Sequence, residues 1–331
     1  MGGFRVAFLL LTLNLCYLCF FSHPGLAQLS PNYYATICPN VETIVRGAVT
    51  QKSRETVNAV GGVVRILFHD CFVEGCDASV LIASTSSNAA EKDHPDNLSL
   101  SFDGYDAVIR AKAAVDADPQ CTGKVSCADI LVMAARDAIA LAGGPTYAVE
   151  LGRLDGLSST ASSVNGKLPG PTFDLDQLTS LFQANGLSVP DLIALSAAHS
   201  VGVGHCSKFS NRLYNFGPGS PVDPTLNMNY AAQLMNSCPL NANTDGTVLL
   251  DPVTPGSFDN QYYKNLQGGM GLFSSDQVLF SDIRSRPIVD SWAQSSPAFQ
   301  QAFVDAITKL GRVGVKTGLQ GNIRKDCAVL N

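Results

Sequence analysis

The sequence has little of what a membrane protein, a nucleic-acid-binding protein or a metal–thiolate protein needs. After residue 27 no apolar run is long enough to span a bilayer. The net charge is −6, and no basic patch of the kind that binds nucleic acid occurs. There are no paired CxxC motifs, which argues against a zinc–thiolate site, and no internal repeat or low-complexity linker. With 46% hydrophobic residues, the chain can form a sizeable core in one large domain or two packed lobes.

The first 27 residues form a segment of their own. A short basic start, "MGGFR", precedes the apolar run "VAFLLLTLNLCYLCFF", and small residues stand at the cleavage positions Gly25 and Ala27. This pattern predicts a secretory signal peptide over 1–27, followed by one mature domain over 28–331. We expect that domain to leave the membrane after cleavage and to be secreted.

Ten cysteines are present, and Cys16 and Cys19 fall within the predicted signal. The others are Cys38, Cys71, Cys76, Cys121, Cys127, Cys206, Cys238 and Cys327. An even number in a secreted chain predicts four disulfides, and spacing alone leaves about 105 possible pairings.

The periodicity of the apolar residues is mainly helical. It predicts helices over 40–53, 101–117, 126–144, 174–186, 189–202 and 298–314, and a helical reading of 63–71 puts Arg65 and His69 on one face. Ser126 can cap the third of these helices. Strand signals are few, and "TYAVEL" (146–151) is the best of them; the polar segments 154–171 and 215–228 are expected to form ordered loops.

Two histidines stand out among the four that follow residue 27. His69 lies in "VVRILFHDC" one helical turn after Arg65, a cation that needs a partner if it is buried. His199 lies in "LIALSAAHSVG", on the same helical stripe as Leu192 and Leu195. Each histidine taken alone is better interpreted as part of the core. Zinc fits the pair poorly because further ligands are missing at the usual spacing. A haem between two helices fits both, with one histidine on the iron and the other on the opposite face.

Several long motifs carry a specific resemblance. "RILFHDCFVEGCDASVL" and "DLIALSAAHSVGVGHC" resemble the distal and proximal signatures of the class III family of secreted plant haem peroxidases. The similarity runs from "QLSPNYYATICPNVETIV" to "GNIRKDCAVLN". It implies a mainly α-helical fold in which one haem b lies between a distal and a proximal lobe. It also implies reduction of hydrogen peroxide to water while phenolic donors, such as lignin precursors, are oxidised in two one-electron steps. We expect a monomer that binds no nucleic acid and reaches the cell wall or apoplast, with a vacuolar destination as a second possibility.

The resemblance assigns catalytic roles to four distal residues. His69 would be the base that moves a proton between the two oxygens of the peroxide, and Arg65 would stabilise the charge on the departing oxygen, with Phe68 beside them. Asn97 would accept the second N–H of His69. The alternative for Asn97 is a glycosylation sequon, since Asn97-Leu98-Ser99 matches that pattern.

On the proximal side the resemblance makes His199 the axial ligand of the haem iron. Asp276 would accept its other N–H and make the imidazole more electron-rich. The alternative for Asp276 is a helix N-cap in front of "QVLF".

The resemblance also implies two calcium ions. Distal ligands would be Asp70, Val73, Gly75, Asp77 and Ser79, with Glu91 acting through water; proximal ligands would be Ser200, Asp251, Thr254, Ser257 and Asp259. Two departures are visible: Ser200 stands where the family usually has Thr, and Leu250 stands where some relatives have a Phe that packs on the proximal imidazole. The alternative for the proximal cluster is a solvated acidic loop.

The remaining expectations come from the same resemblance. The disulfides would be Cys38–Cys121, Cys71–Cys76, Cys127–Cys327 and Cys206–Cys238, with Asp129 and Arg153 as a buried ion pair. Pro169 would form one wall of the donor site, His94 and Ser207-Lys208 lie in segments near its entrance, and His205 is interpreted as structural. Two other hypotheses are a calcium-stabilised wall protein that acts by binding, and a haem-free zinc or calcium protein.

Overall fold

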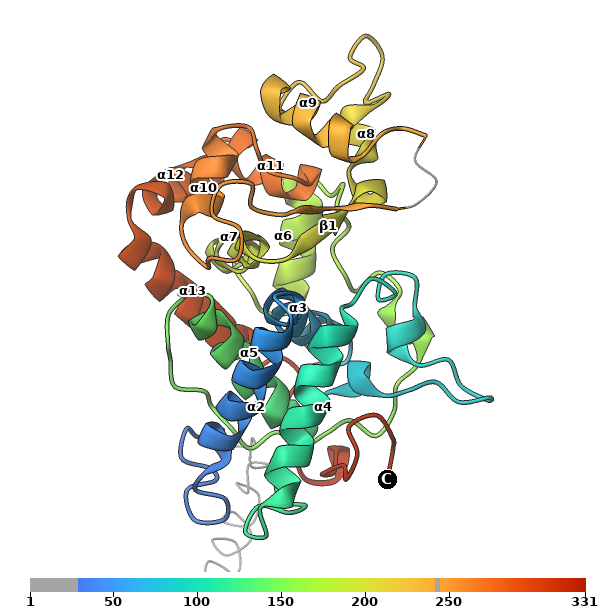
Figure 1. The fold of residues 1–331 in the computed structure, drawn as a ribbon, viewed down its shortest axis with the longest axis vertical. Helices are drawn as coiled ribbons and strands as arrows, with labels where there is room; N and C mark the ends of the chain where they lie inside the picture. Colours follow the sequence, from blue (N-terminus) through green and yellow to red (C-terminus); the bar gives the residue numbers. More distant parts are fainter. Residues whose placement is uncertain (1–28, 242–244) are drawn as a thin grey trace, which may run out of the picture.

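The computed structural model describes residues 29–241 and 245–331, and the predicted signal peptide lies outside them. Two groups of helices lie one above the other, with α3 between them (Figure 1). The first group contains α2 (Val41–Glu55), α3 (Asn58–Val73), α4 (Phe102–Ala117) and α5 (Cys127–Leu141). The second contains α6 (Leu175–Ala184), α7 (Val189–Ser196), α8 (Ser210–Leu213), α9 (Met228–Ser237), α10 (Gln261–Gln267), α11 (Ser274–Ser281), α12 (Arg286–Gln294) and α13 (Ser296–Leu310). We call these groups the distal and the proximal lobe, and the mainly α-helical, two-lobed fold is as expected.

Capping side chains explain where several helices begin. Ser126 accepts the amide of Asp129 at 3.1 Å, so the predicted cap of α5 is confirmed. Asp174 and Gln177 form a capping box at the start of α6. These local bonds satisfy amides that have no partner within the helix, and they place the first turn of each helix where the sequence pattern indicates.

The helix predicted over 189–202 is shorter than expected. The α-helical part ends at Ser196 and continues as a 3-10 turn, η4 (Ala197–Ser200). Ser196 donates its hydroxyl back to the Leu192 carbonyl at 2.8 Å, a bond that competes with regular helix geometry. His199 therefore follows Leu192 and Leu195 on a 3-10 turn, and not on the continuous α-helix that was predicted to carry all three.

The β structure is limited to one antiparallel pair in the described part of the chain. Strand β1 (Val203–His205) pairs with β2 (Thr247–Leu249), with Val203 opposite Leu249. The strand predicted over 146–151 is wrong, because only Leu151 pairs, in an isolated bridge with Ser30. The segment alternates in burial as a strand would, but no neighbouring strand continues the ladder.

Two glycines allow backbones to approach each other closely at functional positions. A Cβ on Gly61, near the start of α3, would lie 3.1 Å from the Cα of Gly202, which follows η4. A Cβ on Gly75, whose φ is +99°, would lie 2.5 Å from the carbonyl oxygen of Gly314. The first contact brings the helix that carries His69 against the segment that carries His199, and α3 and η4 are in contact.

Four disulfides cross-link the fold, and their pairing is the one expected: Cys38–Cys121, Cys71–Cys76, Cys127–Cys327 and Cys206–Cys238. Cys127–Cys327 spans 200 residues and ties the end of the chain to α5. On the chain-entropy model such a long loop stabilises the fold by about 4–5 kcal/mol.

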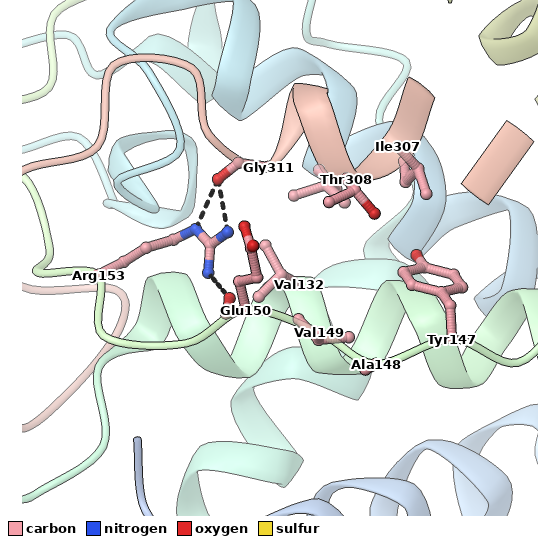
Figure 2. A pocket seen from close by; sticks show the side chains of 10 residues that line it. Val132, Tyr147, Ala148, Val149, Glu150, Arg153, Ile307, Thr308 and Gly311 are labelled. Atoms are coloured by element: carbon pink, nitrogen blue, oxygen red, sulfur yellow. Dashed lines mark hydrogen bonds between the residues drawn. The ribbon is translucent and has the colours of Figure 1, made fainter. Parts of the chain in front are cut away.

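The expected buried ion pair between Asp129 and Arg153 is also present, at 3.0 Å. Arg153 additionally donates to the carbonyl of Gly311, beside a cavity of about 20 Å³ that Tyr147 also lines (Figure 2). A space of this size holds about one water molecule, so it belongs to the packing of the core.

Candidate active site

The distal part of the site is carried by α3, which presents Arg65 and His69 one turn apart. Arg65 is held by Ser99, since its Nη1 donates to the Ser99 carbonyl at 2.8 Å and its Nη2 to the Ser99 hydroxyl at 3.0 Å. The guanidinium is therefore held by a loop of the same lobe and not by an acid. Ser99 was missed in the sequence analysis, because a loop residue 34 positions away leaves no periodic signal.

His69 is anchored by Asn97. Its Nδ1 lies 2.7 Å from Asn97 Oδ1, and Asn97 Nδ2 donates to the Glu91 carbonyl at 2.8 Å. Because a carbonyl accepts from Nδ2, the oxygen of the amide must face His69, and Nδ1 of His69 must carry the proton. The lone pair is then left on Nε2. Asn97 is 2% exposed, and a glycan has no room at a side chain so deeply buried.

Burial, and after it the nearby Arg65 cation, lower the pKa of His69 to about 3, although the hydrogen bond that His69 donates to Asn97 opposes both effects. The imidazole is therefore neutral throughout the physiological range, as a proton acceptor must be.

Phe68 packs between helices. Its ring stacks on Phe72, with centroids 4.1 Å apart, and lies 5.9 Å from Phe182 of α6. It meets His69 edge-on at 6.2 Å. Phe68 thus supports the face of α3 next to the base.

The proximal part of the site is built on η4 and α11. His199 Nδ1 lies 2.7 Å from Asp276 Oδ1. Asp276 is at the third position of α11 and its Oδ2 accepts the amide of Phe273 at 3.0 Å. The N-cap position belongs to Phe273, so Asp276 is not the N-cap itself. One oxygen of Asp276 bonds the backbone amide at the start of α11, and the other bonds His199. The same carboxylate therefore makes both kinds of contact that the two interpretations expected.

Asp276 receives a third donor that the sequence analysis missed. Tyr262 of α10 donates its hydroxyl to Asp276 Oδ1 at 2.9 Å. Burial opposes ionisation of Asp276, but the charge and hydrogen bond of His199, with the Phe273 amide and Tyr262, lower its pKa below the ordinary value. His199 therefore faces a carboxylate.

An aromatic ring does lie against the proximal imidazole, but from an unexpected position. The ring of Phe273 meets His199 edge-on, with centroids 5.4 Å apart. Leu250 lies beside Gly202 instead, and both Leu250 and Phe273 belong to a small second core under α8 and α9. The sequence could have indicated Phe273, because this residue stands at the N-cap position of the helix, three residues before Asp276.

Comparison with known proteins gives this geometry its context. The family model described as "Peroxidase" matches residues 44–295. Peroxidase 51 of Arabidopsis thaliana is 62% identical over 92% of this chain and 93% of its own length. Peroxidase 50 and Peroxidase 16 of the same plant are 59% and 58% identical, over 98% and 95% of this chain and 97% and 96% of their own lengths.

The chain belongs to the peroxidase family. It is a class III plant peroxidase, an oxidoreductase that reduces hydrogen peroxide while it oxidises a donor. Within the described residues no helix is long and apolar enough to cross a membrane.

The peroxidase family implies haem, and the two imidazoles fit it. In the described part of the structure each Nδ1 is engaged, and neither Nε2 has a hydrogen-bond partner. An imidazole that a carboxylate holds and polarises on one nitrogen presents the other nitrogen as a metal ligand.

The predicted distal calcium residues gather in this peroxidase around a buried acidic cluster. Its side chains are Asp70, Asp77, Ser79 and Glu91, all at most 2% exposed. The Ser79 hydroxyl bonds Glu91 Oε2 at 3.1 Å, and Asp70 accepts the amides of Ala78 and Val80. The nearest cation is Lys316, 3.6 Å from Asp77.

The single positive charge of Lys316 does not neutralise the three carboxyl groups of this cluster. Burial and the charge of Asp77 raise the pKa of Asp70 well above its usual range, and burial raises that of Glu91 to about 8. Buried carboxylates that destabilise one another are what a divalent cation would relieve, and oxygen donors suit calcium.

The predicted proximal calcium residues also lie together. Thr254 Oγ1 is 3.4 Å from Asp251 Oδ2 and 3.3 Å from Asp259 Oδ1, and the Ser200 hydroxyl is 3.3 Å from the Asp259 carbonyl. The Ser257 amide bonds the Thr254 carbonyl at 3.1 Å. Asp251 and Ser200 are buried, which argues against the solvated-loop alternative.

Over residues 29–241 and 245–331, no three histidine, cysteine or acidic side chains converge into a metal site by themselves. The two clusters that were predicted to bind calcium also contain hydroxyl oxygens, from Ser79, Ser200 and Thr254. The donor set is thus one that calcium accepts and zinc does not.

An open cavity of about 440 Å³ lies between the two lobes of the peroxidase. Its lining residues are Pro95, Leu98, Ser99, Leu100, His205, Ser207, Lys208 and Asp245. Ser207 and Lys208 are among them as expected, whereas His94 is not. His205 lines it too, with Nδ1 3.5 Å from Asp245, so its purely structural interpretation is incomplete. Pro169 is half-buried and is not part of the lining; the neighbouring Pro171 bonds the start of α11.

Proposed function

We propose that the chain is a haem b peroxidase in which His69 is the acid–base catalyst and His199 the iron ligand, and that its donors are phenols. The observation that carries the proposal is the difference between the two acceptors. A neutral amide holds His69 at 2.7 Å, and a carboxylate holds His199 at 2.7 Å. The amide leaves a neutral base, whereas the carboxylate creates an electron-donating ligand.

His199 would hold the haem iron through Nε2, and the haem, when bound, supplies the redox chemistry that peroxide reduction and two successive one-electron oxidations need. Asp276 keeps the imidazole oriented and electron-rich, which favours the higher oxidation states of iron. Phe273 limits rotation of the ring from one side.

On the distal side, Nε2 of His69 takes a proton from one oxygen of hydrogen peroxide and delivers it to the other, which departs as water. Asn97 keeps Nδ1 protonated during both transfers, so Nε2 is the only nitrogen that can accept. Arg65 stabilises the negative charge on the departing oxygen, and its two bonds to Ser99 hold it in place beforehand.

Two calcium ions would hold the two faces in position. One would bind at Asp70, Asp77, Ser79 and Glu91 with the carbonyls of Val73 and Gly75, and the other at Ser200, Asp251, Thr254, Ser257 and Asp259. Asp70 and Ser200 each adjoin one of the two histidines in the sequence. Calcium therefore fixes the backbone immediately beside each of them.

Phenolic donors would enter through the cavity between the lobes. Pro95 and Leu98 offer apolar contact, and Ser207 and Lys208 offer polar contact on the opposite side. The cavity also contains Ser99, the residue that holds Arg65, so it reaches the distal residues. Pro169 stays a predicted second wall. The predicted signal peptide supports secretion of residues 28–331 to the cell wall, and a monomer stays an expectation from the family resemblance.

The test is spectroscopic and kinetic together. The purified protein should be brown, show a Soret band, and oxidise guaiacol only when hydrogen peroxide is present. A coloured protein without peroxide-dependent oxidation would favour a binding protein that keeps the fold. A colourless protein that still binds calcium would favour the haem-free alternative. Comparison of coniferyl, sinapyl and simpler phenols would then rank the donors.

A further inference from the structure

The carboxylate that holds His199 is shared by two proton donors on the same oxygen. Asp276 Oδ1 accepts from His199 Nδ1 at 2.7 Å and from the Tyr262 hydroxyl at 2.9 Å. Tyr262 is 4% exposed and Asp276 is 2% exposed, so water does not compete for that oxygen. A hydrogen bond to a charged acceptor is strong in such surroundings, and it withdraws part of the negative charge that His199 would otherwise meet.

We propose that Tyr262 is a positioning residue whose hydrogen bond to Asp276 weakens the hydrogen bond between that carboxylate and the His199 N–H. The haem iron is then more easily reduced than it would be with the histidine–aspartate pair alone. This inference rests on the proposed role of His199 as the iron ligand. The effect has a definite direction. Without the tyrosine hydroxyl, Asp276 becomes the stronger acceptor, His199 gains imidazolate character, and the ferric state is stabilised.

A second hydrogen bond to Asp276 distinguishes this electronic effect of Tyr262 from a purely mechanical one, in which the tyrosine only holds the carboxylate in place. Asp276 Oδ2 accepts the Phe273 amide at 3.0 Å, and Asp276 lies within the first turn of α11. The backbone bond keeps the carboxylate in place when Tyr262 loses its hydroxyl. If Tyr262 only held Asp276 in place, its loss would loosen the bond to His199, and the iron would become easier to reduce.

The neighbouring residue gives a matched control. Tyr263 is also fully buried in α10, and its hydroxyl donates to the Ile193 carbonyl at 3.1 Å without touching Asp276. Both tyrosines lose one buried hydroxyl and one hydrogen bond when replaced by phenylalanine. Their contributions to packing are therefore similar, and only Tyr262 reaches the histidine–aspartate pair.

The experiment compares haem-loaded wild type, Tyr262→Phe and Tyr263→Phe by redox titration and by resonance Raman of the ferrous protein. In Tyr262→Phe we expect the iron–imidazole stretch to rise. We expect the ferric-to-ferrous equilibrium to shift toward ferric by up to about tenfold, which is about 59 mV for a one-electron couple. Tyr263→Phe should change neither quantity. An unchanged or more positive potential in Tyr262→Phe would overturn the proposal, as would equal shifts in both variants.

The double variant Tyr262→Phe/Asp276→Asn shows whether the effect passes through the carboxylate. With an amide at position 276, loss of the tyrosine hydroxyl should shift the potential much less than it does in the wild type. An equal shift in both backgrounds would contradict the proposal. Failure of the underlying assignment looks different: the iron–imidazole band would then survive in His199→Ala.

Discussion

The two histidines of this peroxidase sit in opposite environments. His69 lies within an α-helix and bonds a neutral amide, whereas His199 lies on a 3-10 turn and bonds a buried carboxylate. Both use Nδ1 for the anchor and leave Nε2 free. The same side chain is thereby prepared for two tasks, and the acceptor on Nδ1 decides which.

The surroundings reinforce the difference. Beside His69 stands the Arg65 cation, which together with burial keeps that imidazole neutral. Around Asp276, His199 itself and, with it, the Phe273 amide and Tyr262 lower the pKa of the carboxyl group and keep it charged. The distal face is thus arranged for proton transfer and the proximal face for electron donation, and each prediction below tests one side of this contrast.

The largest expected effect is on the distal side. His69→Ala should bind haem normally but react with hydrogen peroxide about 10²–10⁴-fold more slowly, the usual contribution of a general acid–base group. Stopped-flow mixing with peroxide measures this rate. His94→Ala, which removes a histidine that bonds Asn165 outside the site, is the control and should react like wild type. A His69→Ala rate within about tenfold of wild type, or about 1.4 kcal/mol in barrier, would refute the base assignment.

Removal of calcium should disturb both sides at once. Prolonged EDTA treatment should lower the melting temperature and the peroxide rate together. A ligand present at about 100 times its dissociation constant stabilises the fold by about 2.7 kcal/mol. Asp70→Asn and Asp251→Asn separate the two sites. The first should mainly slow the peroxide reaction and the second should mainly alter the iron–imidazole band. Complete loss of calcium with unchanged rate and melting temperature would show that the ions do not support these faces.

A smaller effect is expected when His69 loses its anchor. The pKa of His69 is about 3, so the wild-type peroxide rate should stay constant from neutral pH downward and fall only as the pH approaches that value and the base becomes protonated. The bond to Asn97 raises this pKa, so Asn97→Ala should move the inflection to still lower pH and slow the reaction by about tenfold through a weaker base. Asn165→Ala, which releases only His94, is the control. An inflection that moves to higher pH would contradict the role of Asn97.

The helices and the residues of the site were largely predictable because their signals are local. Ser126 precedes an apolar periodic run, and Arg65 and His69 share a helical face whatever the rest of the chain does. The change from α-helix to 3-10 turn after Ser196 was not predictable. Serine is common in helices, and its sequence position does not reveal that its hydroxyl will bond the Leu192 carbonyl.

Contacts between segments that are far apart in the sequence were also not predictable. Tyr262 and Asp276 meet only because α10 packs against α11, and Ser99 reaches Arg65 across 34 residues of chain. The segment 146–151 has the residues of a strand but no strand to pair with, and pairing is a property of the whole fold.

The contrast between the two histidines is tested most directly by resonance Raman of the reduced haem proteins His69→Ala and His199→Ala. Only His199 should bond the iron, so the iron–imidazole stretch should persist in His69→Ala and vanish in His199→Ala, with weaker haem retention in the latter. The reverse result, a band that vanishes in His69→Ala and persists in His199→Ala, would mean that the two faces of the site are assigned the wrong way round.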